Sequence, residues 1–165
     1  MTPTEAAERR AARALKFDSP EQEAFLSLWR TYDRLNAVEE GLLGEFDLSP
    51  QQYNTLRLLR VGAPRRLPTL AIPERLISRA PDISRLLDRL EARRLIDRRR
   101  SGEDRRQILV GITRAGLALL EKLDAAIVEC HRRQLGHLSR AQVKSLVDLL
   151  REARRPHESD DSPWR

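Results

Sequence analysis

The sequence predicts one domain of mainly α-helical structure, in the α+β class, with six helices and a two-stranded β-hairpin. The chain has 165 residues, close to the roughly 150 residues that one domain typically occupies. Charged residues make up 34% of it and glycines number only seven, a composition that favours amphipathic helices over sheets. Helix-start signals also recur along the chain, and a pair of β-branched segments flanks a turn.

The first predicted helix spans residues 20–46. The segment before it, residues 1–18, is rich in Ala, Arg and Glu without a wide apolar face, so we expect a flexible N-terminal arm there. Ser19 suits the N-cap position and Pro20 the first helical position. Large apolar side chains then recur at helical spacing: Phe25, Leu28, Trp29, Tyr32, Leu35, Leu42 and Phe46.

Two shorter helices are predicted next. Ser49 and Gln52 form a capping-box pattern around a proline, which predicts a helix that runs to about Arg60. A loop with one glycine and two prolines follows in "VGAPRRLP". The segment "TLAIPERLI" (residues 69–77) then predicts a short helix, in which Pro73 must lie near the start because proline lacks a backbone N–H.

The segment "RAPDISRLLDRLEARRL" (residues 79–95) predicts a fourth helix. Pro81 and Asp82 suit its first turn, since proline presets φ and the carboxylate faces the positive end of the helix dipole. Four apolar residues follow the i, i+3, i+4, i+7 spacing and should face the core: Ile83, Leu86, Leu87 and Leu90. Next, "LIDRR" and "QILVGIT" flank the turn-forming "SGED" and predict a β-hairpin.

Two more helices complete the domain. Thr113 suits the N-cap of a fifth helix over about residues 114–134, and Ser139 with Gln142 forms another capping box for a sixth helix. Residues 154–165, which follow it, combine prolines and charges without periodicity. We therefore expect a disordered tail.

Positive charge is concentrated in one part of the chain. The formal net charge is +6, but residues 57–106 hold 15 arginines against 7 acidic residues, whereas the rest of the chain holds 16 basic and 18 acidic residues. This segment includes the third and fourth predicted helices and most of the hairpin. Such a local excess indicates a polyanionic partner, and nucleic acid is the first candidate.

Several other classes of protein are disfavoured. The single cysteine, Cys130, excludes an intramolecular disulfide framework, and we expect a buried, inert thiol rather than a redox sensor. His131 and His137 are poorly spaced for a metal site, so we expect no metal and no cofactor. Nothing resembles a nucleophile elbow, a phosphate loop or a paired-carboxylate site, so we expect no enzyme. Because no apolar stretch approaches the roughly 18 residues of a membrane span, we expect a cytoplasmic protein.

The order of the elements has a physical use. A short helix, a second helix and a hairpin in succession predict a helix-turn-helix followed by a wing. The second helix of such a pair fits the major groove of B-DNA, which is about 12 Å wide. A basic hairpin beside it can reach the neighbouring minor groove, whose negative potential attracts arginine.

The sequence resembles the multiple-antibiotic-resistance regulator (MarR) family of bacterial winged-helix transcription factors over about residues 20–153. The resemblance is carried by "LSPQQYNTLRLL", "ISRLLDRLEARRLIDRR", "SGEDRRQILVGITRAG" and an all-helical C-terminus. It implies a transcription regulator that binds a pseudo-palindromic double-stranded operator as a homodimer, and we expect this regulator to be a repressor. In many members a small aromatic effector or an oxidant releases the DNA.

The resemblance also implies a division of the winged-helix domain, residues 19–153. The DNA-binding part would be about residues 48–113, and the helices at about 20–46 and 114–153 of both chains would form a dimerisation lobe. In the family's wing an Asp two residues before an Arg holds that Arg at the tip for the minor groove. The matching residues here are Asp104 and Arg106.

Three positions depart from the family pattern. Arg94 replaces the glycine usual before the first wing strand, so a helix end with φ > 0 is either absent or strained. The start of the fourth helix, "RAPDIS", replaces the commoner Ser/Thr-Arg-Ala-Thr-Val-Thr type. Pro73 replaces a usual helix former.

These observations define the candidate site residues. Arg85 is the candidate base reader, because a bidentate contact to guanine is the commonest specific one for arginine, and Asp88 is a candidate to hold a wing-base arginine such as Arg99. The predicted DNA contacts are Arg79, Pro81, Asp82, Ser84, Arg85, Arg89, Arg99, Arg100, Asp104, Arg105 and Arg106. A solvated charged surface is the alternative for these residues.

Three aromatic residues form the candidate effector pocket: Trp29, Tyr32 and Tyr53, for which core packing is the alternative. Two other functions stay open. One is a winged-helix module that docks a protein partner without specific DNA readout. The other is an RNA-binding protein, although an aromatic fraction of 4% offers little surface for stacking bases.

Overall fold

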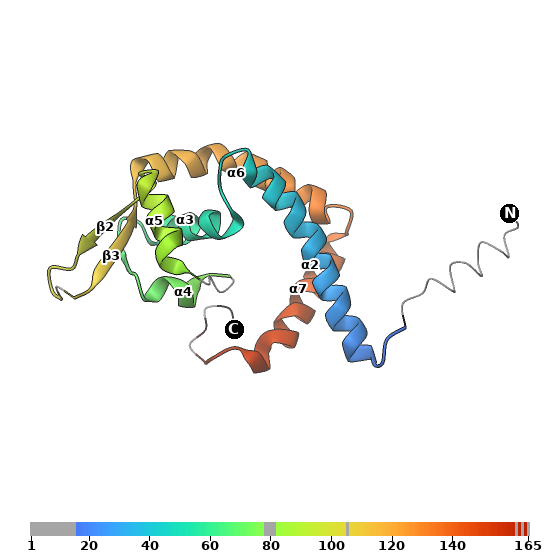
Figure 1. Cartoon of the computed structure of the whole chain (residues 1–165). Coiled ribbons are helices and arrows are strands. Elements are labelled where there is room, and N and C mark those ends of the chain that lie inside the picture. The colour runs from blue at the N-terminus through green and yellow to red at the C-terminus, as the bar shows by residue number, and fades with distance from the viewer. Residues whose placement is uncertain (1–15, 78–81, 105, 161, 163, 165) are drawn as a thin grey trace, which may run out of the picture. The chain divides into compact units, whose positions relative to one another are not determined.

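The computed structural model of the chain describes residues 16–77, 82–104, 106–160, 162 and 164. These residues contain six α-helices, one 3-10 helix and one three-stranded antiparallel sheet (Figure 1), which confirms the predicted class. The helices are α2 (Pro20–Gly44), α3 (Pro50–Gly62), α4 (Ala71–Arg75), α5 (Ile83–Ala92), α6 (Arg114–Leu135) and α7 (Arg140–Arg154). The strands are β1 (Leu67–Pro68), β2 (Ile96–Arg100) and β3 (Ile108–Ile112). The chain divides into two units, residues 1–37 and residues 38–165, and each is described by itself.

The predicted caps at Ser49, Thr113 and Ser139 are confirmed. Asp82, predicted in the first turn of its helix, is instead the N-cap of α5, which begins at Ile83. Ser49 Oγ accepts a hydrogen bond from the Gln52 N–H at 3.2 Å, and Gln52 Oε1 accepts one from the Ser49 N–H at 2.9 Å. Ser139 and Gln142 repeat this reciprocal pair at the start of α7, and the Thr113 hydroxyl caps α6. Each cap pairs donors that a helix leaves open in its first turn and contributes about 1 kcal/mol.

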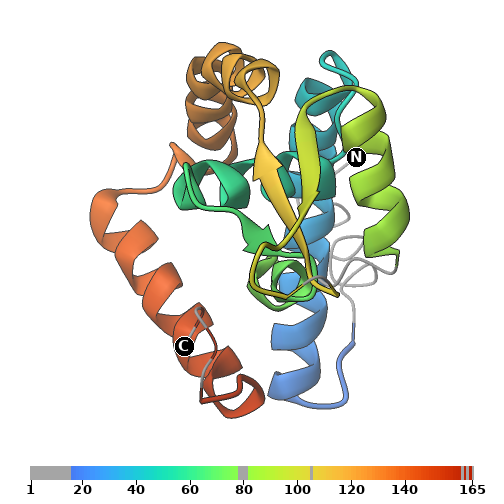
Figure 2. The ribbon, with the colours of Figure 1, turned by 90° about the vertical axis from the view of Figure 1, so that its left-hand side faces the viewer.

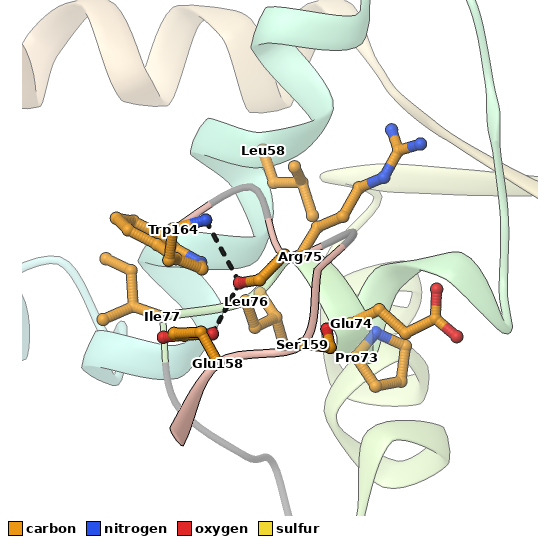
Figure 3. A pocket seen from close by; sticks show the side chains of 10 residues that line it. Leu58, Pro73, Glu74, Arg75, Leu76, Ile77, Glu158, Ser159 and Trp164 are labelled. Carbon is orange, nitrogen blue, oxygen red and sulfur yellow. Dashed lines mark hydrogen bonds between the residues drawn. The ribbon is translucent and has the colours of Figure 1, made fainter. Parts of the chain in front are cut away.

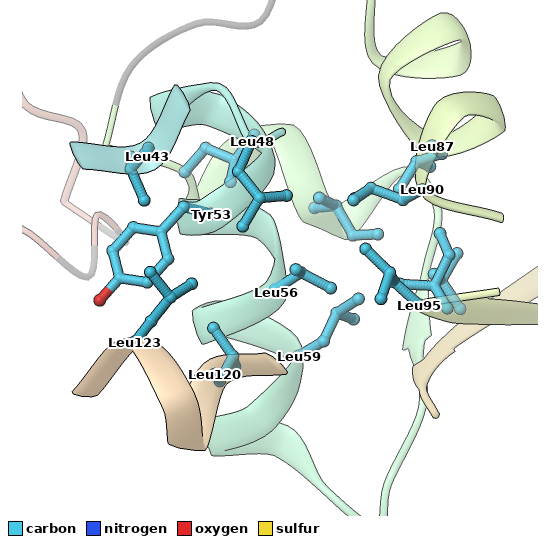
Figure 4. Packing of buried hydrophobic residues seen from close by; sticks show 14 of the residues in the cluster. Leu43, Leu48, Tyr53, Leu56, Leu59, Leu87, Leu90, Leu95, Leu120 and Leu123 are labelled. Carbon is cyan, nitrogen blue, oxygen red and sulfur yellow. The ribbon is translucent and has the colours of Figure 1, made fainter. Parts of the chain in front are cut away.

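One hydrophobic core lies in the second unit. Its fully buried side chains come from helices α2 to α6 and from the sheet (Figure 4): Leu43, Leu56, Leu59, Ile72, Leu87, Leu90, Ile96, Val110, Leu120 and Leu123. On α5, Leu87 and Leu90 are buried, while Ile83 and Leu86 are partly buried against the same cluster. The predicted core face of this helix is therefore confirmed. Because each fully buried leucine contributes about 1.5–3 kcal/mol, the core fixes which side of α5 faces solvent.

The sheet contains a strand that the sequence does not predict. Its strand order is β1-β3-β2, and β2 and β3 form the predicted hairpin, with Ile96 opposite Ile112. β1 adds two residues to the other side of β3, with Leu67 opposite Val110. A two-residue strand that includes a proline shows no alternating pattern, so the sequence alone predicts a loop there. In the folded chain α5 packs beside β2, and α3 packs beside β3 (Figure 2).

The end of α5 shows how the chain reverses direction at Arg94, where glycine is usual in the family. Arg94 has φ 57°, in the left-handed region. Its N–H donates to the Glu91 carbonyl at 2.7 Å, and the Leu95 N–H donates to the Leu90 carbonyl at 3.0 Å, the two bonds of a Schellman motif. The reversal is thus present with an arginine in place of glycine, which costs about 1–2 kcal/mol. It is held because Leu90 and Leu95, on either side, are both buried in the core.

Large apolar side chains remain exposed on several helices. In the first unit, Phe25 is 62%, Trp29 62% and Tyr32 59% exposed. Core packing within one chain is therefore wrong for Trp29 and Tyr32. In the second unit, α7 has no buried residue and its Leu149 is 69% exposed. Since amphipathic helices bury their apolar face, we expect another protein surface to cover the apolar side chains of α2 and α7.

Pro73 lies within α4, and a short 3-10 helix follows α7. Pro73 is the third residue of α4, close to its start as predicted. After α7, residues Arg155–His157 form a 3-10 helix, η1, where the sequence predicts no regular structure. Arg154 Nε donates to the Trp164 carbonyl at 3.1 Å and so ties the end of α7 to the segment that follows η1. None of the described helices combines the length and the apolar character that crossing a membrane requires.

Candidate nucleic-acid interface

The outer face of α5 carries the polar side chains of the predicted recognition helix. Asp82 is the N-cap residue, and its Oδ1 accepts a hydrogen bond from the Arg85 N–H at 2.9 Å. The other carboxylate oxygen lies 3.0 Å from Arg85 Nε. The Arg85 side chain is nevertheless 80% exposed, and Ser84 and Arg89 beside it are exposed as well. Asp82 therefore starts the helix and also orients the arginine that is best placed to read a base.

This face continues into a groove that the sequence does not reveal. The groove has a volume of about 270 Å³ and connects α5 to the start of α3; its lining residues are Ser49, Gln51, Gln52, Asp82, Arg85, Leu86 and Arg89. In the sequence, Ser49 and Gln52 signal only a helix cap. Their position beside α5 depends on how α3 packs against α5, which no local pattern encodes. Three predicted contacts, Arg79, Pro81 and Arg105, lie outside the described residues.

An arginine that is absent from the predicted set joins α5 to the wing. Arg98 Nη2 donates to Asp88 Oδ1 at 2.7 Å, and Arg98 Nε lies 3.5 Å from Glu91 Oε2. The Arg98 side chain is only 24% exposed. Asp88 thus holds a wing-base arginine, as expected, but this arginine is Arg98 and not Arg99. Successive strand side chains point to opposite faces, so the alternation along β2 was the signal that distinguishes Arg98 from Arg99.

The base of the wing is held by a second arginine. The two terminal nitrogens of Arg66 donate to the two carboxylate oxygens of Asp97 at 2.6 and 2.8 Å, and Arg99 Nε lies 3.3 Å from the same carboxylate. The hydrogen bond from Arg66 holds the pKa of Asp97 below its usual value. The Arg66 guanidinium lies over Gly111, the residue opposite Asp97 in β3, where a Cβ would come within 2.8 Å of Nη1. The bare glycine backbone therefore makes room for this ion pair.

At the tip of the wing, Asp104 binds the backbone of Arg106. Its Oδ1 accepts a hydrogen bond from the Arg106 N–H at 2.9 Å, and its carbonyl accepts one from the Gln107 N–H at 2.9 Å. The Ser101 hydroxyl completes the turn by accepting from the Asp104 N–H at 3.3 Å. The resemblance implies that Asp104 holds Arg106 at the tip, and Asp104 does contact this residue, through its backbone N–H. Asp104 shapes the turn, while the side chains of Arg100 and Arg106 are exposed.

The candidate effector residues fall in different units. Tyr53 is 4% exposed in the core of the second unit, and burial raises the pKa of its hydroxyl. The core-packing interpretation is therefore correct for Tyr53, whereas Trp29 and Tyr32 lie exposed on α2 in the first unit. A cavity of about 860 Å³ occurs elsewhere in the second unit, between α4 and the segment after η1 (Figure 3). Its lining includes Ile77 and Trp164 and none of the three predicted residues.

The environment of Cys130 disfavours reactive chemistry. Cys130 is 4% exposed, and burial raises the pKa of its thiol, with Glu39 acting in the same direction. A neutral, buried thiol is a poor nucleophile. His131 Nδ1 is 2.9 Å from Gln134 Oε1. Within the described residues, no group of three or more His, Cys, Asp or Glu side chains could hold a metal ion.

Comparisons with known proteins identify the family of this fold. The sequence profile of the MarR family matches residues 46–107, which include α3, α5 and β2. A crystal structure of a MarR transcription factor from Planctomyces limnophilus is 52% identical, with a TM-score of 0.65, over 82% of this chain and 98% of that chain. The chain belongs to the MarR family.

More distant MarR proteins share the fold. BpsR of Bordetella bronchiseptica, whose DNA binding is regulated by 6-hydroxynicotinic acid, is 24% identical with a TM-score of 0.71, over 79% of this chain and 98% of that chain. A mutant MarR from E. coli, complexed with operator DNA, is 21% identical with a TM-score of 0.70, over 76% and 89% of the two chains. No curated protein matches the chain.

Membership of the MarR family accounts for the arrangement of the elements. This MarR-family protein is a DNA-binding transcription regulator with a winged helix-turn-helix, and it is not an enzyme. In this fold, α5 occupies the position of the recognition helix, and the hairpin β2–β3 forms the wing. Part of the groove lining therefore lies on the recognition helix, and Arg98, Arg99 and Arg100 lie on the wing.

Proposed function

We propose that this MarR-family protein is a cytoplasmic repressor that binds a pseudo-palindromic operator as a homodimer. The observation that carries the proposal is the accessible polar face of α5 beside an arginine-bearing hairpin. Arg85 is 80% exposed yet oriented by Asp82, and the core fixes this face outward. A helix of this kind enters the major groove and reads base edges with the residues of its first turns.

The proposed contacts divide into base readers and backbone contacts. On α5, Arg85 reads a guanine, with Ser84 and Arg89 beside it on the same exposed face. The wing contacts the phosphates and the minor groove, whose negative potential attracts arginine. The arginines assigned to these contacts are Arg99, Arg100, Arg105 and Arg106. Arg79 and Pro81 complete the recognition segment in this proposal, Asp82 positions Arg85, and Asp104 shapes the turn that presents Arg106.

Exposed apolar helix faces support the homodimer. Phe25, Trp29 and Tyr32 of α2 are each more than half exposed, and α7 buries no side chain within one chain. Contiguous apolar surface of this kind marks an interaction site. We therefore assign α2, α6 and α7 of two chains to a shared dimerisation lobe. Sedimentation at micromolar concentration tests this assignment, and a stable monomer refutes it.

Selection of binding sites from a random-sequence duplex pool tests the DNA-binding proposal. The selected duplexes should contain an inverted repeat with half-sites one helical turn apart, about 34 Å. In mobility-shift titrations, Arg85→Ala should cost about 1–3 kcal/mol on this operator and less on random duplex. Arg106→Ala should weaken binding while the dimer and its melting stay intact. Lys16→Ala, which removes one exposed positive charge before α2 and outside the helices and the wing assigned to dimerisation and DNA binding, serves as the matched control.

The salt dependence distinguishes DNA binding from the alternative function. Because phosphate contacts release counterions, log K should fall with log salt at a slope of about −0.9 per phosphate neutralised. A protein that uses α5 to dock a protein partner should show no salt-sensitive retention on heparin or random duplex. That outcome, with no operator selected, would favour the protein-interaction module.

The proposal also includes release of the DNA by a small aromatic effector. BpsR, a relative of the same fold, is regulated by 6-hydroxynicotinic acid, and exposed Trp29 and Tyr32 of α2 supply aromatic surface here. Titration of the operator complex with this acid should release DNA if the chain accepts the same class of ligand. Quenching of Trp29 fluorescence in a Trp164→Phe variant should follow the same curve. Unchanged fluorescence and unchanged DNA binding would show that this acid is not an effector of the protein.

A further inference from the structure

The helix end that closes α2 has the same geometry as the end of α5. The Leu48 N–H donates to the Leu43 carbonyl at 3.0 Å, and the Asp47 N–H donates to the Gly44 carbonyl at 3.1 Å. Asp47 has φ 54°, in the left-handed region, so this is a second Schellman motif with a residue other than glycine. The chain passes directly from this reversal into Ser49, the cap of α3.

One arginine connects the two helix ends. Arg93 is the C-cap residue of α5, and its terminal nitrogens donate to the carbonyls of Phe46 (3.1 Å) and Asp47, 47 and 46 residues earlier in the chain. The last turn of α2, all of which the structure describes, carries no basic side chain. Carbonyls at a helix C-terminus hold partial negative charge, which a cation stabilises. Arg93 supplies that cation from a different helix.

This contact joins two elements with different tasks. α2 belongs to the dimerisation lobe in the function proposed above, and α5 is the recognition helix. In a homodimer, the distance between the two recognition helices depends on how firmly each is held to the helix that makes the dimer contact. Buried leucines fix α5 inside its own lobe but are spread over several elements, whereas Arg93 ties the end of α5 directly to the turn that closes α2.

We propose that Arg93 is a positioning residue that sets the spacing of the two recognition helices by holding α5 to the end of α2. The inference rests on the proposed operator binding and goes beyond it. The fork of the guanidinium matters, because it donates to two adjacent carbonyls at once, whereas a lysine ammonium acts as a point charge. Loss of the fork should loosen the spacing while leaving the base-reading face of α5 intact.

Half-site spacing is the measurement that tests this role. Operator duplexes are prepared with the selected spacing and with one base pair inserted or removed between the half-sites, and each is titrated by fluorescence anisotropy. Arg93→Ala should lower affinity at the selected spacing about fivefold, the value of one typical hydrogen bond, and lower it less at the altered spacings. The ratio between spacings should therefore shrink. Arg93→Lys should give an intermediate ratio, and Lys16→Ala the wild-type ratio.

Other outcomes overturn the inference. An unchanged ratio in Arg93→Ala, or an equal loss at every spacing and on random duplex, reduces Arg93 to a structural contact. Urea titration establishes that the variant folds, and Arg93→Lys carries the test if the alanine variant does not. If the wild-type protein selects no operator, the proposed function itself is refuted. An operator whose spacing preference survives Arg93→Ala refutes this inference alone.

Discussion

Substitution of Gly111 by alanine would show whether Arg66 holds the base of the wing. A Cβ at this position would lie 2.8 Å from Nη1, 3.0 Å from Cζ and 3.1 Å from Cγ of Arg66. Carbon atoms do not approach nitrogen so closely without a bond, so the guanidinium must move. Its two hydrogen bonds to Asp97, at 2.6 and 2.8 Å, leave no room for such a movement.

The expected cost follows from the geometry and exposure of the pair. A hydrogen bond to a charged group contributes about 1.5–3 kcal/mol when shielded. The side chains of Arg66 and Asp97 are 23% and 35% exposed, which places their pair at or below the lower end of that range. Alanine in a strand gains about 0.5 kcal/mol over glycine. Gly111→Ala should therefore lower the free energy of unfolding by about 1 kcal/mol.

Urea denaturation in two backgrounds measures this effect. In the wild-type background, the midpoint should fall while the slope of the transition stays constant. In an Arg66→Ala background, where the obstructing guanidinium is absent, Gly111→Ala should be neutral or stabilise the protein by about 0.5 kcal/mol. An equal destabilisation in both backgrounds would refute the explanation, because the cost would then arise from another neighbour of Gly111.

Three further predictions concern the wing and the end of α5. Arg98→Ala leaves the Asp88 carboxylate unpaired near DNA and should weaken operator binding about fivefold. Asp88→Asn breaks the same ion pair but also removes the negative charge that repels DNA, so it should weaken binding less. Anisotropy titrations of the operator measure both effects. Arg94→Gly relieves the left-handed strain and should raise the free energy of unfolding by about 0.5–1 kcal/mol, and a lower urea midpoint would contradict this. The pKa of Asp97 is lowered in the folded protein, so its ion pair stabilises the fold above about pH 4 and the contribution is lost as the pH falls through the folded pKa. Urea titrations of the wild-type protein and of Arg66→Ala should accordingly converge in acid, and a constant difference down to low pH would contradict the assignment.

The features that the sequence predicts well are those that depend on neighbouring residues. The caps at Ser49, Thr113 and Ser139 each require one side chain and a backbone amide within the next few positions, and all three form as predicted. The core face of α5 follows from a spacing of three and four residues, and Leu87 and Leu90 on that face are buried. Such signals are readable because their partners lie within one turn of helix.

The features that the sequence misses depend on distant parts of the chain. β1 exists because Leu67 meets Val110, and no alternating pattern marks a strand of two residues. Arg94 keeps a left-handed φ without glycine, since two buried leucines enforce it and neither is a local signal. Asp104 accepts a hydrogen bond from the backbone N–H of Arg106, and the motif alone does not show whether the backbone or the side chain of that residue is the partner.

The contact between Asp82 and Arg85 has a consequence for the entropy of recognition. A free arginine side chain at a protein surface samples many rotamers, and ordering it on a base edge costs about 0.5–1.5 kcal/mol at the moment of binding. Here the Asp82 carboxylate already restrains the Arg85 guanidinium in the free protein, at 3.0 Å. Part of that ordering therefore occurs during folding. In the proposed complex, the affinity of Arg85 for its base consequently depends on Asp82, even where the carboxylate touches no base.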